Sequence, residues 1–184
     1  LADEAKARAG LQPYDIVLDI GANDRTFLEQ FPLPLAAIGY DPAAMDSRVV
    51  SEFFSADSFL HYSDGEKAKL ITALAMFYDL DDPRKFLADV RDCLADDGLF
   101  IIQQNDRDIM VRDLTYDNIG FEHLCYYDVP QMRGLARAAG LRCFEATYNE
   151  VNGGSHRLFF KRDQPELVGS SYLVFTFSDF ASRV

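Results

Sequence analysis

Residues 16–28 constrain this chain more than any other stretch, because they join a buried strand to a glycine turn. The apolar run of residues 14–20 predicts a strand that ends in Asp19 and Ile20. Gly21 has no Cβ and lets a ligand approach the backbone, and a helix expected from about Thr26 points free N–H groups at the same place. A strand, a tight turn and a helix start in this order predict a nucleotide-binding turn.

A second acid follows another short strand. The apolar segment 36–40 predicts this strand, and Asp41 stands at its carboxyl end, where an adenosine cofactor places its ribose hydroxyls. Asn23 and Arg25 occupy positions where a dinucleotide fingerprint has glycines, which argues against NAD. The turn and the acid together predict a bound nucleoside.

This turn resembles motif I of class I S-adenosylmethionine (SAM) methyltransferases, in which no pyrophosphate has to fit. The resemblance implies SAM as the cofactor and S-adenosylhomocysteine (SAH) as the product. Many doubly wound proteins have a strand, a glycine turn and a later acid, so a different doubly wound protein remains an alternative at this point. The residues expected to bind the cofactor lie in the turn and at the ends of four strands: Asp19, Gly21, Ala22, Asn23, Asp41, Pro42, Ala56, Asp57, Ser58, Ala75 and Met76.

Length and charge narrow the class of protein. The 184 residues, 48% of them hydrophobic, are enough for one core, so we expect a single domain over 1–184, with 164–184 as a helical tail or a linker to a missing domain. The net charge is −12, from 30 acidic and 18 basic residues, and no run is rich in Lys or Arg. Nucleic acid is excluded as a partner, because phosphate neutralisation needs a basic patch. Small molecules or protein partners are favoured.

The cysteines and the termini add weaker constraints. Cys93, Cys125 and Cys143 form no C-x-x-C pair, so neither a disulfide framework nor a zinc cluster is predicted, and no metal is expected. A reducing cytoplasm is the expected location. We find no signal peptide and no apolar run long enough to cross a bilayer, and we expect no membrane contact. A first residue of Leu rather than Met is consistent with a piece of a larger protein.

Helical and strand patterns alternate along the chain. Parallel pairing with right-handed crossovers follows from this alternation, and ligands in such sheets bind at the carboxyl ends of the strands. The elements expected after Asp41 are a strand at 49–54 followed by the corner Ala56–Ser58, a strand at 70–76, a helix from Pro83 to about Ala95 and a strand at 99–104. Asp57 in that corner accepts from the adenine amine or is a solvated turn residue, with even weight on each.

The last third of the chain predicts a different ending. Asp128 is expected to cap a helix that Gly140 stops, and two strands at 141–151 and 155–161 are joined by Asn152-Gly153-Gly154, a type I′ hairpin signal. A helix from about Ser170 is expected in the tail. The predicted fold class is α/β, a Rossmann-like, doubly wound, mostly parallel seven-stranded sheet with a C-terminal antiparallel hairpin, as in class I SAM methyltransferases.

Four segments in order carry a more specific resemblance. The chain resembles the SAM-dependent C-methyltransferase family that includes the nucleotide-sugar C-methyltransferases, and it is similar only to their central methyl-transfer domain. The family's zinc-binding N-terminal region and its second Rossmann-like C-terminal domain are not in this sequence. The segments that carry the resemblance are 16–28, the Phe-Tyr-Asp-Leu run within 71–83, the Glu-His segment within 116–127, and Asn-Gly-Gly-Ser-His-Arg at 152–157.

The resemblance implies methylation of a carbon next to a carbonyl in a small-molecule acceptor, as a step of small-molecule biosynthesis. This chemistry needs a base for the C–H proton and a donor for the enolate oxygen. His123 is the implied base, with Glu122 beside it and Tyr78 as a donor. The residues assigned to the acceptor are Tyr126, Tyr127, Asn152, Ser155 and Arg157.

Each assignment has a structural alternative. The tyrosines are equally well explained as an aromatic wall or core, Arg157 is either a fork for a phosphate or carboxylate or a solvated side chain, and His123 either acts as the base or pins the loop through both ring nitrogens. Phe121 stands where the family commonly has His, and Arg25 where it commonly has Gly. A SAM-binding scaffold or regulatory domain that has lost catalysis, and an O- or N-methyltransferase, are therefore the alternative functions.

Overall fold

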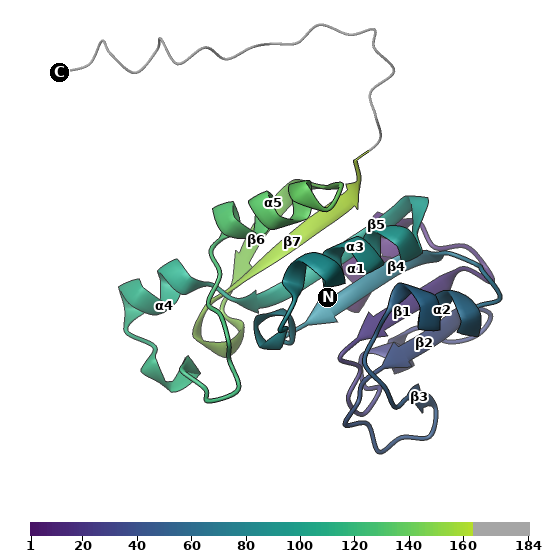
Figure 1. The fold of residues 1–184 in the computed structure, drawn as a ribbon, viewed down its shortest axis with the longest axis horizontal. Helices are drawn as coiled ribbons and strands as arrows, with labels where there is room; N and C mark the ends of the chain where they lie inside the picture. Colours follow the sequence, from purple (N-terminus) through teal and green to yellow (C-terminus); the bar gives the residue numbers. More distant parts are fainter. Residues whose placement is uncertain (164–184) are drawn as a thin grey trace, which may run out of the picture.

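The computed structural model describes residues 1–163, in which helices cover both faces of one twisted sheet (Figure 1). Helices separate the strands only from β3 to β6, because β1 and β2 are joined through a 3₁₀ turn and no helix lies between β2 and β3. The elements are α1 (Ala2–Ala9), β1 (Ile16–Ile20), η1 (Leu28–Gln30), β2 (Ala36–Tyr40), β3 (Val49–Val50), α2 (Ala56–Tyr62), β4 (Ala68–Leu74), η2 (Phe77–Asp79), α3 (Pro83–Cys93), β5 (Leu94–Asn105), α4 (Arg107–Asp113), η3 (Tyr116–Asn118), α5 (Val129–Ala138), β6 (Leu141–Asn149), η4 (Val151–Gly153) and β7 (Ser155–Arg162), where η marks a 3₁₀ turn.

The seven strands lie in the order β3-β2-β1-β4-β5-β7-β6. The first five pair in parallel, while β7 runs antiparallel to β5, and β6 runs antiparallel to β7. The predicted mostly parallel, doubly wound sheet with a terminal antiparallel hairpin is confirmed. The order reverses at β1, so the carboxyl ends of β1, β2 and β4 flank one crevice, which is where such sheets bind ligands.

Two hydrophobic clusters pack on opposite faces of the sheet, because neighbouring residues of a strand point to opposite sides. Leu18 of β1 belongs to the cluster under α2, α3 and α5, whereas its neighbour Val17 belongs to the cluster under α1. Phe160 and Phe159 of β7 divide in the same way. This alternation explains why the strands are apolar on both faces.

Side-chain caps fix the starts of two core helices. Asp82 accepts a hydrogen bond from Lys85 N at 2.9 Å at the start of α3, and Pro83 follows at the first helical position. Asp128 begins α5 with a capping box. Its Oδ1 accepts from Gln131 N at 2.7 Å, and Gln131 Oε1 accepts from Asp128 N at 3.2 Å. The predicted cap at Asp128 is confirmed.

The helix expected from Thr26 does not form, and only the 3₁₀ turn η1 follows the glycine turn. Asp24 Oδ1 accepts from Thr26 N at 3.0 Å, and Asn23 and Arg25 have positive φ angles of 45° and 66°. A local side-chain bond and left-handed residues compete with helix formation, and two prolines follow within the next turns. The turn is therefore a series of tight bends.

Other predicted boundaries are also wrong in detail. The strand expected at 49–54 ends at Val50, and the fifth strand begins earlier, at Leu94. The hairpin connection is the five-residue segment 150–154 rather than a two-residue type I′ turn. The helix α4 was not predicted, although Asp106 caps it by accepting from Ile109 N at 3.0 Å. The helix expected from Ser170 lies outside the described residues.

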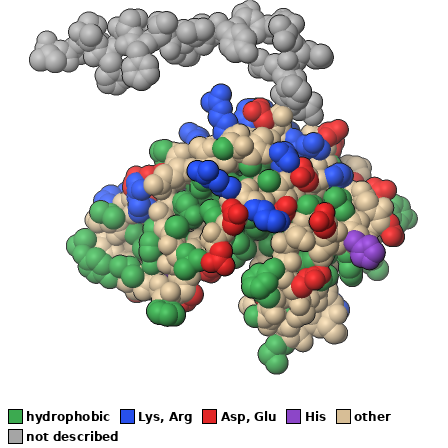
Figure 2. Space-filling model, viewed as in Figure 1, with side chains coloured by type: hydrophobic (Ala, Val, Ile, Leu, Met, Phe, Trp, Pro, Cys, Tyr) green, Lys and Arg blue, Asp and Glu red, His purple; other side chains and the backbone are tan. Residues whose placement is uncertain are grey.

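The helix α4 and the segment after it stand away from the sheet and carry exposed hydrophobic side chains (Figure 2). Val111, Leu114, Tyr116, Ile119, Phe121 and Leu124 are all more than half exposed. The irregular character predicted for residues 113–127 is confirmed apart from the short turn η3. No helix among residues 1–163 combines the length and the apolar character needed to span a bilayer.

Arg157 joins three elements on the α1 side of the sheet. Its Nε and Nη2 donate to Gln103 Oε1 of β5 at 2.8 and 2.6 Å, and its Nη1 donates to Glu4 of α1. The Arg157 side chain is only 16% exposed. Arg157 therefore acts as a brace between β7, β5 and α1.

We expect Arg157→Ala to lower the free energy of unfolding by about 1.5 to 3 kcal/mol, because it removes charge-assisted hydrogen bonds from a half-buried site. Urea unfolding followed by circular dichroism measures the change. Arg133→Ala, which removes an exposed arginine of α5, is the matched control and is expected to be nearly neutral. Equal unfolding midpoints for the two variants would contradict the brace.

Asp19 is a buried acid in the middle of the sheet. It is 3% exposed and accepts from Thr72 Oγ1 of β4 at 2.5 Å. Burial raises the pKa of Asp19 to about 7; the Thr72 bond opposes the rise, and the charge of Asp41 adds to it. The folded protein thus holds the Asp19 proton more tightly than the unfolded chain does.

The pH dependence follows from this difference. The folded pKa lies above the unfolded value of 3.8, so the free energy of unfolding is expected to fall as pH rises from about 4 to about 7, by at most about 1.4 kcal/mol per pH unit from this group. Asp19→Asn removes this titration and keeps the side chain's shape. Unfolding in urea at several pH values is the measurement, and parallel pH profiles for the parent and the variant would refute the assignment.

Candidate active site

A pocket of about 260 Å³ opens at the carboxyl ends of β1, β2 and β4. Figure 2 shows the surface hollowed on this side, between the part of the molecule that carries α4 and the part that carries β2 and β3. Gly21, Asp41, Pro42 and Met76, all predicted cofactor residues, line the pocket. The other lining residues are Ile20, Tyr40, Phe53, Phe54, Asp79, Leu80 and Phe86.

Gly21 forms the floor of this pocket, where a larger residue would be strained and would crowd Met76. Its φ angle is +81°, and a Cβ built on it would lie 2.9 Å from Met76 Cγ. Gly21 N and Ala22 N both donate to Tyr40 O, at 2.8 and 3.1 Å, which holds the turn against the end of β2. The predicted close approach of the backbone to a ligand is thus matched by an open floor.

Asp41 ties together the two turns that border the pocket. Its Oδ2 accepts from Asn23 N at 3.0 Å, and its Oδ1 accepts from Ala43 N at 2.8 Å. Each carboxylate oxygen has a second lone pair, so both can still accept from a ribose diol. The acceptor oxygens of Asp41 and the open floor at Gly21 suit an adenosyl group, whose ribose hydroxyls donate hydrogen bonds.

Other predicted cofactor residues shape the pocket from behind it. Ala22 is buried, Asn23 supplies the backbone bond to Asp41, and Asp19 lies buried beneath the turn. Ala75 has a φ angle of +54° at the end of β4, and its N donates to Gln103 O at 2.8 Å. A left-handed residue other than glycine directs the chain sharply, and here it turns Met76 into the pocket.

The corner Ala56–Ser58 is placed differently from the prediction. These residues form the first turn of α2, which Ser55 caps, and none of them lines the pocket. Ser58 Oγ instead donates to Glu52 Oε1 at 2.6 Å and lies 3.0 Å from the Tyr40 hydroxyl. Asp57 is exposed in that first turn, which matches the alternative of a solvated residue.

Phe53 and Phe54 supply the pocket wall that the corner was expected to supply. Sequence reasoning missed them because it continued the third strand through them, whereas the strand ends at Val50. Phe54 packs edge-on against Tyr40 and Phe86, with ring centroids 5.8 Å apart in both pairs. An aromatic pair two residues after a short edge strand is the signal that marks them.

The structure brings His123 and Tyr78 together from segments far apart in the sequence. Their ring centroids are 4.1 Å apart, and the ring of Tyr126 is 5.9 Å from that of His123. The backbone N–H groups of Leu124 and Cys125 donate to Tyr78 O at 3.0 and 3.2 Å, which holds the loop on η2. Tyr78 precedes Asp79, so this cluster adjoins the pocket described above.

The electrostatics of the cluster suit proton transfer. Burial raises the pKa of Tyr78, and the charges of Asp79 and Glu122 raise it further, so the hydroxyl stays protonated. Burial also raises the pKa of Asp79, while the charge of His123 lowers it. Within residues 1–163, neither ring nitrogen of His123 has a hydrogen-bond partner. The alternative in which both nitrogens are tied to backbone groups is therefore absent from this structure.

Three of the predicted acceptor residues have internal roles. Tyr127 is 8% exposed and packs on Phe77 with ring centroids 5.4 Å apart, and burial raises its pKa. Ser155 is buried, and its Oγ donates to Val151 O at 2.8 Å. Arg157 is held by Gln103 and Glu4, as described. For Tyr127 this corrects the expected substrate contact, because a core side chain presents no free edge.

The other two lie nearer to solvent. Tyr126 is half-buried beside α4, and Asn152 is exposed with a φ angle of +51°. Asn152 O accepts from Asn118 Nδ2 at 2.9 Å, so the hairpin turn is tied to the loop that leads to His123. The hairpin and the loop are thus neighbours, as an acceptor site between them requires.

Phe121 and Arg25, the two residues that depart from the family pattern, both lie outside the cofactor pocket. Phe121 is fully exposed, and the ring contacts of His123 are with Tyr78 and Tyr126. Arg25 keeps the left-handed backbone that glycine favours, with a φ angle of +66°, and its Nη1 donates to Arg48 O at 3.0 Å. Neither side chain lines the pocket at Gly21.

Comparisons with known proteins agree with this geometry. A family model described as a methyltransferase domain matches residues 1–146. C-methyltransferase NovU of Streptomyces niveus is 27% identical over 169 residues, which cover 86% of this chain and 40% of that protein. This chain thus spans less than half the length of that relative.

Solved structures share the fold at low identity. The cyclopropane synthase MmaA2 from Mycobacterium tuberculosis superposes with a TM-score of 0.65 at 13% identity, covering 86% of this chain and 82% of that one. Magnesium protoporphyrin IX methyltransferase (ChlM) from Synechocystis PCC 6803, solved with bound SAH, gives 0.62 at 11% identity, with 88% and 81% covered.

The family match extends over most of the chain, and the solved structures share its fold. The expected fold is confirmed, and the methyltransferase domain match indicates SAM as the cofactor. The chain belongs to the methyltransferase domain family and has the class I SAM methyltransferase fold.

Proposed function

We propose that this chain methylates a carbon next to a carbonyl group in a small-molecule acceptor. The observation that carries the proposal is the His123 ring, which lies on Tyr78 beside the cofactor pocket and has both nitrogens free within residues 1–163. The similarity to a C-methyltransferase supports the same reaction. That relative is much longer than this chain, so the acceptor and any flanking domains belong to the proposal as well.

The cofactor is held by this chain's own groups. We assign the ribose of the cofactor to Asp41 and its adenine to the aromatic wall of Phe53 and Phe54. The cofactor lies against the backbone at Gly21, where no side chain intervenes. SAM, when bound, supplies an electrophilic methyl group. Apolar walls exclude water from that group and leave the carbon nucleophile as its reaction partner.

His123 acts as the general base in this proposal. Neutral imidazole accepts the proton of a C–H bond that the adjacent carbonyl makes acidic, and the electron pair moves onto the carbonyl oxygen as an enolate. The Tyr78 hydroxyl, kept protonated by its raised pKa, donates to that oxygen. Glu122 is exposed next to His123 and adds a negative charge at the edge of the site.

Two alternatives keep specific support. Phe121 in place of a family His favours a SAM-binding scaffold or regulatory domain, and the cofactor half of the site suits an O- or N-methyltransferase equally well.

The match to less than half of NovU favours a place in a larger multidomain protein. The three free cysteines, Cys93, Cys125 and Cys143, support a cytoplasmic location.

The ribose assignment predicts that Asp41→Ala weakens binding of SAM and SAH about tenfold or more, because charge-assisted hydrogen bonds worth roughly 1.5 to 3 kcal/mol each are removed. Isothermal titration calorimetry measures the affinity. Glu66→Ala is the matched control, since Glu66 is an exposed carboxylate that does not line the pocket. Unchanged affinity in Asp41→Ala would refute the assignment.

The base assignment predicts that His123→Gln slows methyl transfer by about a hundredfold to ten-thousandfold, while SAM affinity stays unchanged. Glutamine keeps hydrogen bonding but cannot accept a proton near neutral pH. The assay follows labelled methyl from SAM into a carbonyl acceptor found by screening, with His61→Gln, an exposed histidine of α2, as the control.

The outcomes of this assay bear on the base and on the function. A rate within a few-fold of the parent in His123→Gln shows that another group is the base. SAM binding with no methylated acceptor supports the scaffold, whereas methyl transfer to oxygen or nitrogen supports the third function, and these two outcomes exclude each other.

A further inference from the structure

A second cavity, of about 250 Å³, lies between α4 and the segment that leads from it to His123. We call it the α4–loop cavity. It shares no lining residue with the cofactor pocket. The helix α4 and the segment after it supply the whole lining, which consists of Arg107, Met110, Val111, Thr115, Tyr116, Ile119 and Tyr126.

Tyr126 connects this cavity to the proposed base. It lines the cavity, and its ring centroid is 5.9 Å from that of His123. The His123 ring also contacts Tyr78, with centroids 4.1 Å apart, and Tyr78 precedes Asp79, which lines the cofactor pocket. The His123 cluster therefore adjoins both the cofactor pocket and the α4–loop cavity.

The wall of the cavity is apolar. Met110, Val111 and Ile119 supply aliphatic and thioether surface, and Tyr116 and Tyr126 supply aromatic surface. Val111, Tyr116 and Ile119 are more than half exposed, so a ligand seated among them removes apolar area from water. Apolar cavities of roughly 150 Å³ accommodate benzene. The α4–loop cavity is thus large enough for one aromatic ring or a short alkyl chain.

The charges at this place disfavour an anionic ligand. Arg107 is the charged residue of the lining, and it is already paired, because its Nη2 donates to Asp108 Oδ1 at 2.9 Å and also to Asp128. Two further acids, Asp79 and Glu122, act by charge on the adjoining cluster. A phosphate group would have to break the pairs of Arg107 and would be repelled by these carboxylates.

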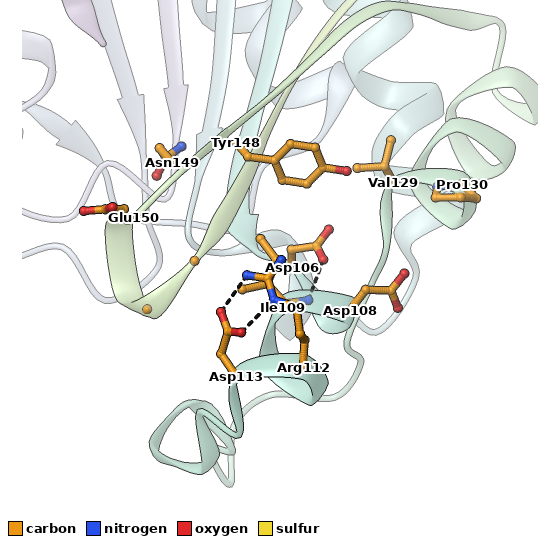
Figure 3. Close-up of a pocket in the computed structure, with 12 residues that line it drawn as sticks. Asp106, Asp108, Ile109, Arg112, Asp113, Val129, Pro130, Tyr148, Asn149 and Glu150 are labelled. Carbon is orange, nitrogen blue, oxygen red and sulfur yellow. Dashed lines mark hydrogen bonds and ion pairs between the residues drawn. The ribbon is translucent and has the colours of Figure 1, made fainter.

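The larger cavity on another face of α4 suits an anionic acceptor no better. It has a volume of about 810 Å³ and lies between α4, the start of α5 and the hairpin turn (Figure 3). Figure 3 shows its base, Arg112, bonded to Asp113, and the other charged residues of its lining are Asp106, Asp108 and Glu150. Among the described residues, neither cavity presents an unpaired base to a phosphate group.

We propose that the acceptor is a neutral ketone with an aryl or alkyl substituent, and that this substituent occupies the α4–loop cavity while the carbon next to the carbonyl lies at His123. This inference rests on the proposed function, because it names the acceptor class for the same base. The reaction is the one given above. His123 takes the C–H proton, and the carbon takes the methyl group from the sulfonium, which becomes the thioether of SAH.

Methionine methyl groups report on the two sites separately. Met110 lines the α4–loop cavity, Met76 lines the cofactor pocket, and Met45 is 99% exposed outside both and serves as the reference. The probes are benzylacetone, a ketone with a phenyl ring two carbons away, and dihydroxyacetone phosphate, an anionic ketone. NMR of protein with ¹³C-labelled methionine methyls, first saturated with SAH as checked at Met76, follows each titration.

Benzylacetone is expected to shift the Met110 signal, with a dissociation constant in the millimolar range or tighter. Dihydroxyacetone phosphate is expected to bind at least about tenfold more weakly, since it lacks the ring and carries charge. An unmoved Met110 signal would overturn the proposal and would leave the cavity wall as a surface for another part of a larger protein. Equal or tighter binding of dihydroxyacetone phosphate would overturn it as well.

Methyl transfer is scored in a separate assay, with labelled methyl from SAM, so that the cavity and the proposed function can fail independently. A shift of Met110 with methyl transfer only to oxygen or nitrogen supports the cavity and contradicts C-methylation. C-methylation of dihydroxyacetone phosphate with an unmoved Met110 supports the function and contradicts the cavity.

Ile119→Ser tests the cavity wall, and Leu114→Ser is its matched control. Ile119 and Leu114 are 62% and 61% exposed, but Leu114 does not line the cavity. Both side chains are exposed, so both variants are expected to keep the fold. Ile119→Ser is expected to weaken benzylacetone binding about threefold to tenfold, because apolar contact area is lost. Parent-like affinity in Ile119→Ser, or an equal loss in Leu114→Ser, would refute the assignment of the substituent to this cavity.

Discussion

The carboxylate of Asp41 holds the cofactor end of this molecule together. It accepts from Asn23 N and Ala43 N, and so joins the turn after β1 to the turn after β2. These turns lie beyond the paired strands, and the Asp41 carboxylate is the side-chain link between them. Gly21 and Ala22 add their bonds to Tyr40 O, and the floor of the pocket follows from these contacts. The same acid therefore serves both the architecture and the ribose assignment.

The sheet was predictable because its strands are buried on both faces and are read as continuous apolar runs. The two helix starts at Asp82 and Asp128 were predictable because their caps are local in sequence. The missing helix after Gly21 and the unpredicted α4 were decided by Asp24 and Asp106, whose side chains bond the backbone two or three residues on. An acid of this kind starts a helix in one place and prevents one in the other, and the difference depends on neighbouring left-handed residues and prolines.

The candidate site was also predictable from the sequence only in part. Gly21 and Asp41 could be assigned from local pattern, since a turn and an acid after a strand keep their spacing in this fold. The proximity of His123 to Tyr78 was implied only by resemblance, because no periodicity places residues of an irregular loop. Phe53 and Phe54 were missed since a strand boundary decides their role, and Arg157 was assigned to the acceptor although it braces β7, β5 and α1. The pocket of about 810 Å³ between α4, the start of α5 and the hairpin turn (Figure 3) arises from tertiary packing and has no sequence signature.

Arg25 makes the cofactor turn dependent on a contact outside it. Its φ angle of +66° lies in the left-handed region, where a side chain is strained and a glycine is not. The hydrogen bond from Arg25 Nη1 to Arg48 O offsets part of that strain. The shape of the turn is thereby linked to the segment between β2 and β3, so a change in that segment is transmitted to the floor of the pocket.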